Sequence, residues 1–222
     1  MIFVIRPEPG LQSTLQSARD MGLAAIGLPL FEVIPLQWDA PSPDDFDALL
    51  IGSANAMRHA GKALEQYVDL PVHAVGKATA DAAEEAGFSV ERVGEGGLQS
   101  VLDGNAEATR YLRLGGVEKV ALDPGKHTIT ARNVYEVRPL PITGSAQVGL
   151  RTGKPCVLVH SAAAARHFGN EINRIGLDRQ AIHLACIGPR VAAAAGEGWG
   201  AVESAPQPND DALLALARDM CH

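Results

Sequence analysis

Two stretches of this chain share one pattern: AVGKATADAAEEAGFSV at residues 74–90 and CIGPRVAAAAGEGWGAV at residues 186–202. Each stretch starts as a short apolar strand, passes through a glycine (Gly76 or Gly188) and continues as an alanine-rich helix. A strand that leads through glycine into a helix leaves the first N–H groups of that helix without partners, and such groups bind anions. Two such turns in one chain predict one anionic ligand held by two related halves.

The composition is that of an ordinary globular protein. Of the 222 residues, 46% are hydrophobic and 20% are charged, which suits one large domain or two small ones. The net charge of −7 gives no indication of nucleic-acid or acidic-membrane binding. Three cysteines are an odd number, which argues against a disulfide framework and for a reducing compartment. Because we find neither a signal-peptide pattern nor an apolar run of about 18 residues, we expect a cytoplasmic protein without a membrane span.

The repeat extends beyond the two glycine turns. CVLVHSAAAARHFGNEI at residues 156–172 repeats ALLIGSANAMRHAGKAL at residues 48–64, and Ser161 matches Ser53. Apolar runs alternate with helical segments through both copies, which indicates α/β units with parallel sheets. The sequence therefore predicts two α/β domains related by an internal repeat.

Two proline-rich segments mark the domain boundaries. We predict an inserted domain 2 at residues 43–133, entered by a linker strand at residues 36–42 and left by a return linker strand at residues 134–141. The remaining residues, 1–35 and 142–222, form a discontinuous domain 1. Ligands of open α/β sheets bind outside the carboxyl ends of the strands, so two domains predict an active-site cleft between them.

The residues on which this organisation rests resemble, in type and order, the uroporphyrinogen-III synthase family. The matching features are Arg6-Pro7, SANA at 53–56, AVGKATA at 74–80, Tyr135-Glu136, the Ser161 turn and IGP at 187–189. The resemblance implies two flavodoxin-like domains joined by a two-stranded linker, in a monomer without cofactor or metal. It implies a cyclising hydro-lyase of haem biosynthesis that closes hydroxymethylbilane to uroporphyrinogen III, with loss of water and inversion of ring D. It also implies a transient contact with the preceding enzyme of the pathway.

Helix N-termini of both domains would hold the substrate carboxylates through backbone N–H groups. Charge from Arg6, Lys77 and Arg190 would add to this, and Tyr135 is the candidate general acid for water loss. We expect Tyr135→Phe to slow turnover without abolishing it, and Gly188→Val to damage binding by crowding its turn. The complete set expected to bind substrate is Arg6, Ser53, Ala54, Asn55, Gly76, Lys77, Thr79, Ser161, Ala162, Gly188, Pro189, Arg190 and Val191.

The same residues also have structural interpretations. The two glycines can simply permit tight turns. Serine and threonine at these positions commonly cap helices, which applies to Ser53, Thr79 and Ser161. Arg6 can hold the two linkers, and Tyr135 can pack in the core.

The chain departs from the family pattern at two places. The second glycine turn reads IGPRVA at residues 187–192. The family usually has a sequence like IGPTTA there, so this chain lacks its two hydroxyl side chains. No helix is expected in residues 117–133, after the strand YLRLGG. These departures would suit an alternative function, a catalytically retired two-lobed protein that binds an anionic ligand. A nucleotide- or phosphate-using α/β enzyme is a third hypothesis, which the lack of G-x-G-x-x-G and Walker patterns disfavours.

Overall fold

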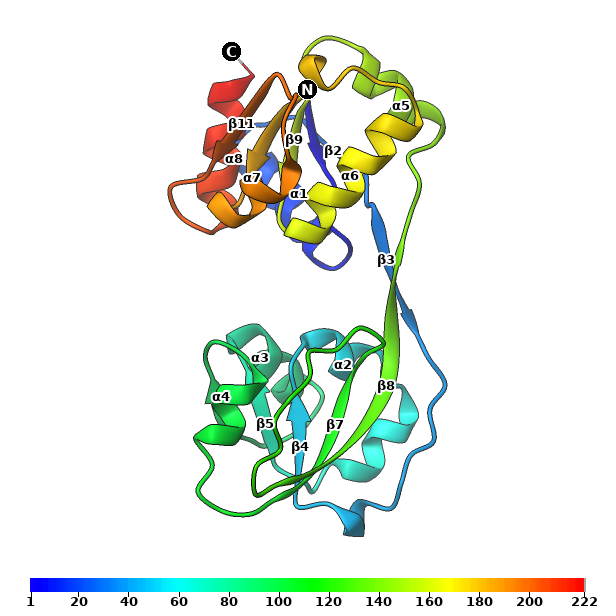
Figure 1. Ribbon diagram of the computed structural model, residues 1–222, viewed down its shortest axis with the longest axis vertical. Coiled ribbons are helices and arrows are strands. Elements are labelled where there is room, and N and C mark those ends of the chain that lie inside the picture. Colours follow the sequence, from blue (N-terminus) through cyan, green and yellow to red (C-terminus); the bar gives the residue numbers. More distant parts are fainter. Residues whose placement is uncertain (222) are drawn as a thin grey trace. The chain divides into compact units, whose positions relative to one another are not determined.

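The computed structural model describes residues 1–221, which form two compact units (Figure 1). Unit 1 comprises Met1–Glu32 and the chain from Arg138 onward, and unit 2 comprises Val33–Val137. The chain passes between them through β3 (Phe31–Pro35) and β8 (Thr128–Pro139), which are neighbours in one sheet. Within residues 1–221, no helix is long and apolar enough to span a membrane.

The predicted position of the first linker strand is wrong. Residues 36–42 contain neither helix nor strand, and the strand lies earlier, at β3. The return strand begins at Thr128, not at residue 134, because β8 pairs with β7 (Arg110–Gly116) along the whole length of β7. Hydrophobic periodicity alone does not reveal this pairing.

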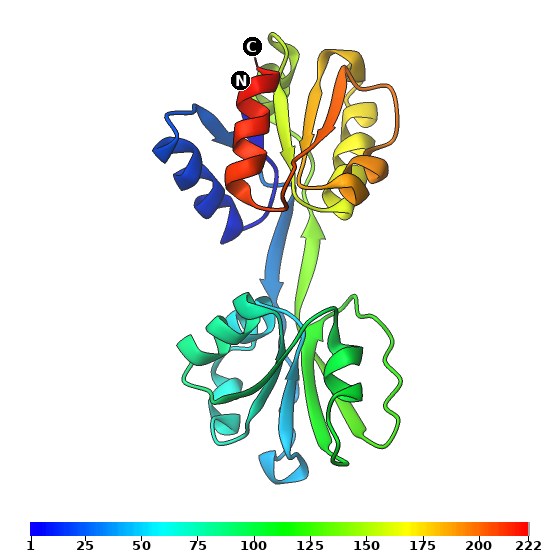
Figure 2. The same ribbon diagram turned by 90° about the vertical axis from the view of Figure 1, so that its left-hand side faces the viewer.

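Unit 1 contains a five-stranded parallel sheet with the flavodoxin-like order 2-1-3-4-5. In spatial order its strands are β2 (Ala25–Gly27), β1 (Ile2–Val4), β9 (Cys156–Val159), β10 (His183–Cys186) and β11 (Ala201–Ser204). Phe3 and Ile5 pack in the core under α5 (Gly144–Arg151), α6 (Ala162–Arg174) and α7 (Pro189–Ala195). Ile2 and Val4 face α1 (Gly10–Asp20) and α8 (Asp210–Met220) on the other side (Figure 2).

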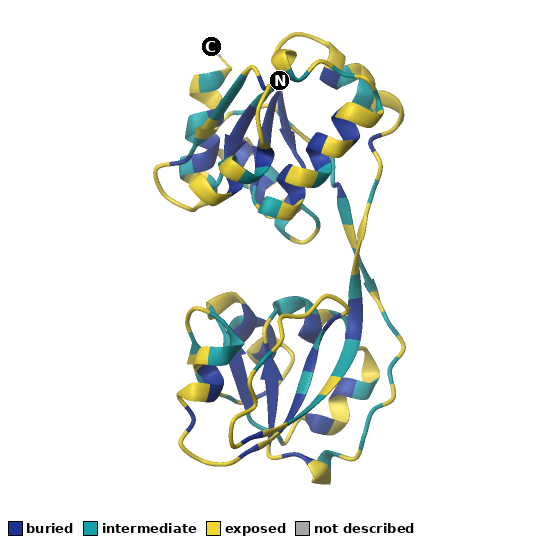
Figure 3. Ribbon diagram, in the orientation of Figure 1, coloured by how far each residue is buried: buried dark blue, intermediate teal, exposed yellow. Residues whose placement is uncertain are grey.

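Unit 2 contains a six-stranded sheet in the order β3-β8-β7-β4-β5-β6. Its further strands are β4 (Ala48–Ile51), β5 (Val72–Val75) and β6 (Val90–Gly94). One face packs under α2 (Ala54–His59) and α3 (Lys77–Glu85), and the other face under α4 (Leu98–Asp103). The central strands of both sheets are buried, as their continuous apolar runs predict (Figure 3).

The two sheets have the same strand order once unit 1 is read from its second segment. The series β9, β10, β11, β1, β2 then takes the same places as β4, β5, β6, β7, β8. The predicted internal repeat is therefore confirmed, and it is circularly permuted. In this alignment α8 corresponds to α4, while α1 corresponds to residues 117–127, where no helix forms, as expected.

Candidate functional site

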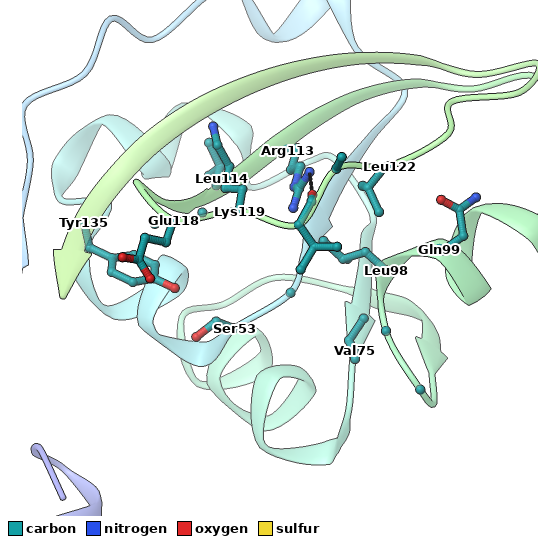
Figure 4. A pocket seen from close by; sticks show the side chains of 17 residues that line it. Ser53, Val75, Leu98, Gln99, Arg113, Leu114, Glu118, Lys119, Leu122 and Tyr135 are labelled. Carbon is teal, nitrogen blue, oxygen red and sulfur yellow. Dashed lines mark hydrogen bonds between the residues drawn. The ribbon is translucent and has the colours of Figure 1, made fainter. Parts of the chain in front are cut away.

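A pocket of about 390 Å³ opens at the carboxyl edge of the unit 2 sheet (Figure 4). Ser53 lines it from the end of β4, and Gly116 lines it from the end of β7. These strands are neighbours, and the chain continues from β4 to β5 on the opposite side of β4 from β7. This reversal of strand order is where doubly wound sheets bind their ligands. The remaining wall comes from the start of α4, from residues 118–122 and from Tyr135.

A β-bulge fixes Tyr135 in this pocket. Gly115 pairs with Asn133, but Gly116 pairs with Tyr135, so Val134 is an extra residue in β8. The Tyr135 ring lies so close to Gly116 that a Cβ built there would be 2.9 Å from its Cε2 atom. Tyr135 is only 9% exposed, yet within residues 1–221 no protein group hydrogen-bonds to its hydroxyl. The ring is thus packed, and the hydroxyl is available to a ligand.

Both candidate serines cap helices. The Ser53 Oγ accepts a hydrogen bond from the Asn55 N–H at 3.3 Å, and the Ser161 Oγ accepts one from the Ala164 N–H at 3.1 Å. Ala54 and Ala162 are the first helical residues that follow these caps. A ligand at these turns would therefore meet backbone N–H groups of the first turn.

The Gly76 turn contributes fewer residues to the unit 2 pocket than its sequence predicts. Gly76 has a φ of 75°, so the backbone itself requires glycine here. Lys77 forms an ion pair with Asp81 at 2.6 Å on the exposed face of α3. Thr79 is buried beneath the helix. Of this turn only Val75 lines the pocket, so the structure does not bring Lys77 and Thr79 to it.

At the Gly188 turn the backbone is extended, and no other part of the described chain lies close to the position of a Cβ. The Gly188 φ of 178° is extended and can be adopted by any residue, and a Cβ built there meets no atom within 4 Å. A Cβ at Gly188 therefore does not crowd the turn as expected, and the effect of Gly188→Val on binding stays a prediction. Pro189 has no N–H, the Val191 N–H bonds to the Gly188 carbonyl at 3.0 Å, and Arg190 is exposed.

Arg6 lies at the carboxyl end of β1 and is bound within unit 1. Its Nη1 donates to Asp210 Oδ2 at 3.3 Å and to Thr14 Oγ1 at 3.2 Å. His160 Nε2 contacts Asp210 Oδ1 at 3.0 Å. The hydrogen bond to His160, with smaller contributions from Thr14 and from the charges of His160 and Arg6, outweighs the opposing effect of burial and lowers the pKa of Asp210 to about 2. This interpretation of Arg6 is structural, but its partner is the start of α8 and not the linkers.

Two cations, Arg113 and Lys119, line the unit 2 pocket and were not predicted from the sequence. Arg113 Nη1 donates to the Val120 carbonyl at 3.0 Å. Burial lowers the pKa of the Arg113 guanidinium, and burial together with the Arg113 charge lowers the pKa of Lys119. The available signal was an arginine inside the apolar strand YLRLGG, just before its two glycines. Among residues 1–221, no group of three or more His, Cys, Asp or Glu side chains could hold a metal ion.

Doubly wound sheets, with a pocket that contains two cations at the point of strand reversal, define an α/β protein with a candidate small-molecule site. The sequence model of uroporphyrinogen-III synthase HemD matches residues 12–215. The chain therefore belongs to the uroporphyrinogen-III synthase family and is a cyclising lyase of haem biosynthesis.

Solved structures show the same fold. Uroporphyrinogen-III synthetase from Helicobacter pylori is 19% identical, with a TM-score of 0.69 over 99% of this chain and 98% of that chain. A mutant uroporphyrinogen III synthase from the extremely thermophilic bacterium Thermus thermophilus is 14% identical, with a TM-score of 0.57 over 100% of this chain and 99% of that chain. A comparison with curated protein sequences found no match.

Proposed function

We propose that this enzyme closes the linear tetrapyrrole hydroxymethylbilane to uroporphyrinogen III, losing water and inverting ring D. The observation that supports this most is the family match over residues 12–215. The unit 2 pocket adds to it, because it is lined by a packed tyrosine with an available hydroxyl and by two cations that form no ion pair within residues 1–221. The substrate has acetate and propionate carboxylates on every pyrrole, which suits such a pocket.

Binding uses mainly backbone groups in this proposal. The first-turn N–H groups of Ala54 in unit 2 and of Ala162 in unit 1 follow capped helix starts. The Asn55 N–H, which donates to Ser53 Oγ at 3.3 Å, would exchange that cap for a carboxylate. Each helix terminus favours a carboxylate by about 0.3–1 kcal/mol when exposed. Gly188 and Arg190 add an open turn and an exposed charge. Four further members of the predicted set support the local structure: Gly76 by its backbone conformation, Thr79 and Val191 by packing, and Arg6 by its bond to Asp210.

The chemical step requires little from side chains. Loss of the terminal hydroxyl gives an azafulvenium cation that the pyrrole nitrogen stabilises. Holding the chain bent, so that the substituted carbon of ring D attacks, supplies most of the rate advantage. In this proposal Tyr135 donates a proton to the departing hydroxyl, since its own hydroxyl has no protein partner within the described residues. The substituted carbon then forms a spiro intermediate, from which ring D rearranges.

We further propose that the enzyme works in the cytoplasm as a monomer. Hydroxymethylbilane also closes spontaneously, to the type I isomer. A transient contact with the preceding enzyme of the pathway would shorten the time in which that happens.

Product isomers test this function. Hydroxymethylbilane is generated in situ, the protein is added, the product is oxidised and the uroporphyrin isomers are resolved by chromatography. The proposal expects type III. Type I alone, together with saturable binding of the tetrapyrrole, would favour the retired binding protein that the altered turn at residues 187–192 suggests.

A further inference from the structure

At equivalent positions of the repeat, unit 1 has an arginine that is paired with an aspartate, and unit 2 has no such ion pair among the described residues. In unit 1, Arg6 follows β1 and is neutralised by Asp210, the first residue of α8. The corresponding helix of unit 2, α4, begins at Leu98, which has no charge. Leu98 lies over Gly52, where a Cβ would be 2.9 Å from its Cδ1 atom. This contact takes the place of the contact between His160 and Asp210 in unit 1.

The segment that replaces the missing helix supplies a cation instead. The aliphatic stem of Lys119 lies over Gly115, since a Cβ built on Gly115 would be 3.8 Å from Lys119 Cδ. In the repeat, Gly115 corresponds to Arg6, because Tyr111 pairs with Ala48 as Ile2 pairs with Cys156. The charge of Arg6 thus has a counterpart in unit 2, but one that comes from the loop.

Neither cation of the unit 2 pocket is neutralised. Within the described chain, Arg113 and Lys119 form no ion pair, and Arg113 bonds only to the Val120 carbonyl, at 3.0 Å. Glu118 also lines the pocket, but it makes no ion pair with either cation within residues 1–221. Arg113 is half-buried and Lys119 is exposed, so two cations without an ion pair among the described residues are available to an anion in this pocket.

From this asymmetry we infer that Arg113 at the end of β7 and Lys119 of the loop at residues 117–127 are specificity-determining residues that hold a carboxylate of the tetrapyrrole. The inference rests on the proposed function. It adds two cations of unit 2 to those that recognise the substrate and leaves Arg6 of unit 1 a structural role. The bond from Arg113 to Val120 then fixes the loop so that Lys119 remains over the pocket.

The test compares Lys119→Met with Lys62→Met. Lys62 is also an exposed lysine of unit 2, but it lies outside the pocket. We expect Lys119→Met to raise the KM for hydroxymethylbilane about tenfold or more, with kcat within about twofold, because a charge-assisted hydrogen bond is lost. Lys119→Arg should restore most of the affinity, and Lys62→Met should behave as wild type. Equal melting temperatures would show that all variants fold.

A binding measurement separates this inference from the proposed function. Uroporphyrin III is a stable tetrapyrrole with eight carboxylates and serves as the ligand in this measurement. Lys119→Met and Arg113→Lys should weaken uroporphyrin binding about tenfold, as followed by fluorescence, and Lys62→Met should not. Wild-type KM and wild-type uroporphyrin affinity in Lys119→Met, with type III product still formed, would overturn the inference and leave the function intact. If wild type gave only type I product, the function would fail, and the uroporphyrin titration would still decide whether Lys119 binds carboxylates.

Discussion

Alanine at Gly76 should destabilise the protein and alanine at Gly188 should not, although the two turns look alike in sequence. Gly76 has a φ of 75°, where an L-residue costs about 1–2 kcal/mol. Gly188 has a φ of 178° and open space around its Cα. There alanine gains about 0.4–1 kcal/mol by restricting the unfolded chain and loses a similar amount as a poorer helix cap than glycine.

Thermal unfolding measures the difference. Gly76→Ala should lower the melting temperature of unit 2 by roughly 4 °C or more, while Gly188→Ala should leave that of unit 1 within about 2 °C of wild type. Because Gly188 is structurally tolerant, a larger side chain there probes the ligand alone. Gly188→Val should raise the KM for hydroxymethylbilane without changing the melting temperature. A Gly188→Ala protein destabilised as much as Gly76→Ala would refute the reasoning, as would a Gly188→Val enzyme with wild-type KM.

Two further substitutions test the assigned roles. Tyr135→Phe should keep the fold and lower kcat by on the order of 10²-fold with little change in KM, as steady-state kinetics would show; complete inactivity would mean that side-chain catalysis contributes more than we assign to it. Asp210→Asn should cost about 2 kcal/mol in the free energy of unfolding at pH 7, because the folded pKa of Asp210, about 2, lies below the ordinary value of 3.8. Since a lowered carboxyl pKa stabilises the fold only above these values, the difference from wild type in urea unfolding should shrink as the pH falls from 4 towards 2. The neighbouring substitution Asp211→Asn is the control, and a difference independent of pH would contradict this account.

The fold was largely predictable because its signals are local. The runs IFVI at 2–5 and CVLV at 156–159 read as buried parallel strands and are buried. The repeated glycine turns predicted two α/β units that are related by an internal repeat. The linker strand at 36–42 was misplaced because β3 is defined by its partner β8, and strand pairing leaves no trace in the periodicity of a single segment.

The candidate site was predictable only in part, because several of its features depend on contacts distant in sequence. Ser53 and Tyr135 were expected and line one pocket. The bulge at Val134 that orients Tyr135 exists only through pairing with β7. Arg6 looked available for substrate, but its partner Asp210 lies 204 residues away. Arg113 was overlooked because one charged residue in an apolar strand indicates no function until the structure shows that it lines a pocket and forms no ion pair within residues 1–221.

The isomer composition of the product shows directly whether the protein is a synthase of uroporphyrinogen III. Wild-type protein is titrated against a fixed supply of hydroxymethylbilane, and the fraction of type III uroporphyrin is measured after oxidation at each concentration. We expect this fraction to rise with protein concentration until type III is nearly the only isomer. Lys119→Met should require more protein than Lys62→Met to reach the same fraction. A product that remains type I at every protein concentration would contradict the proposed function.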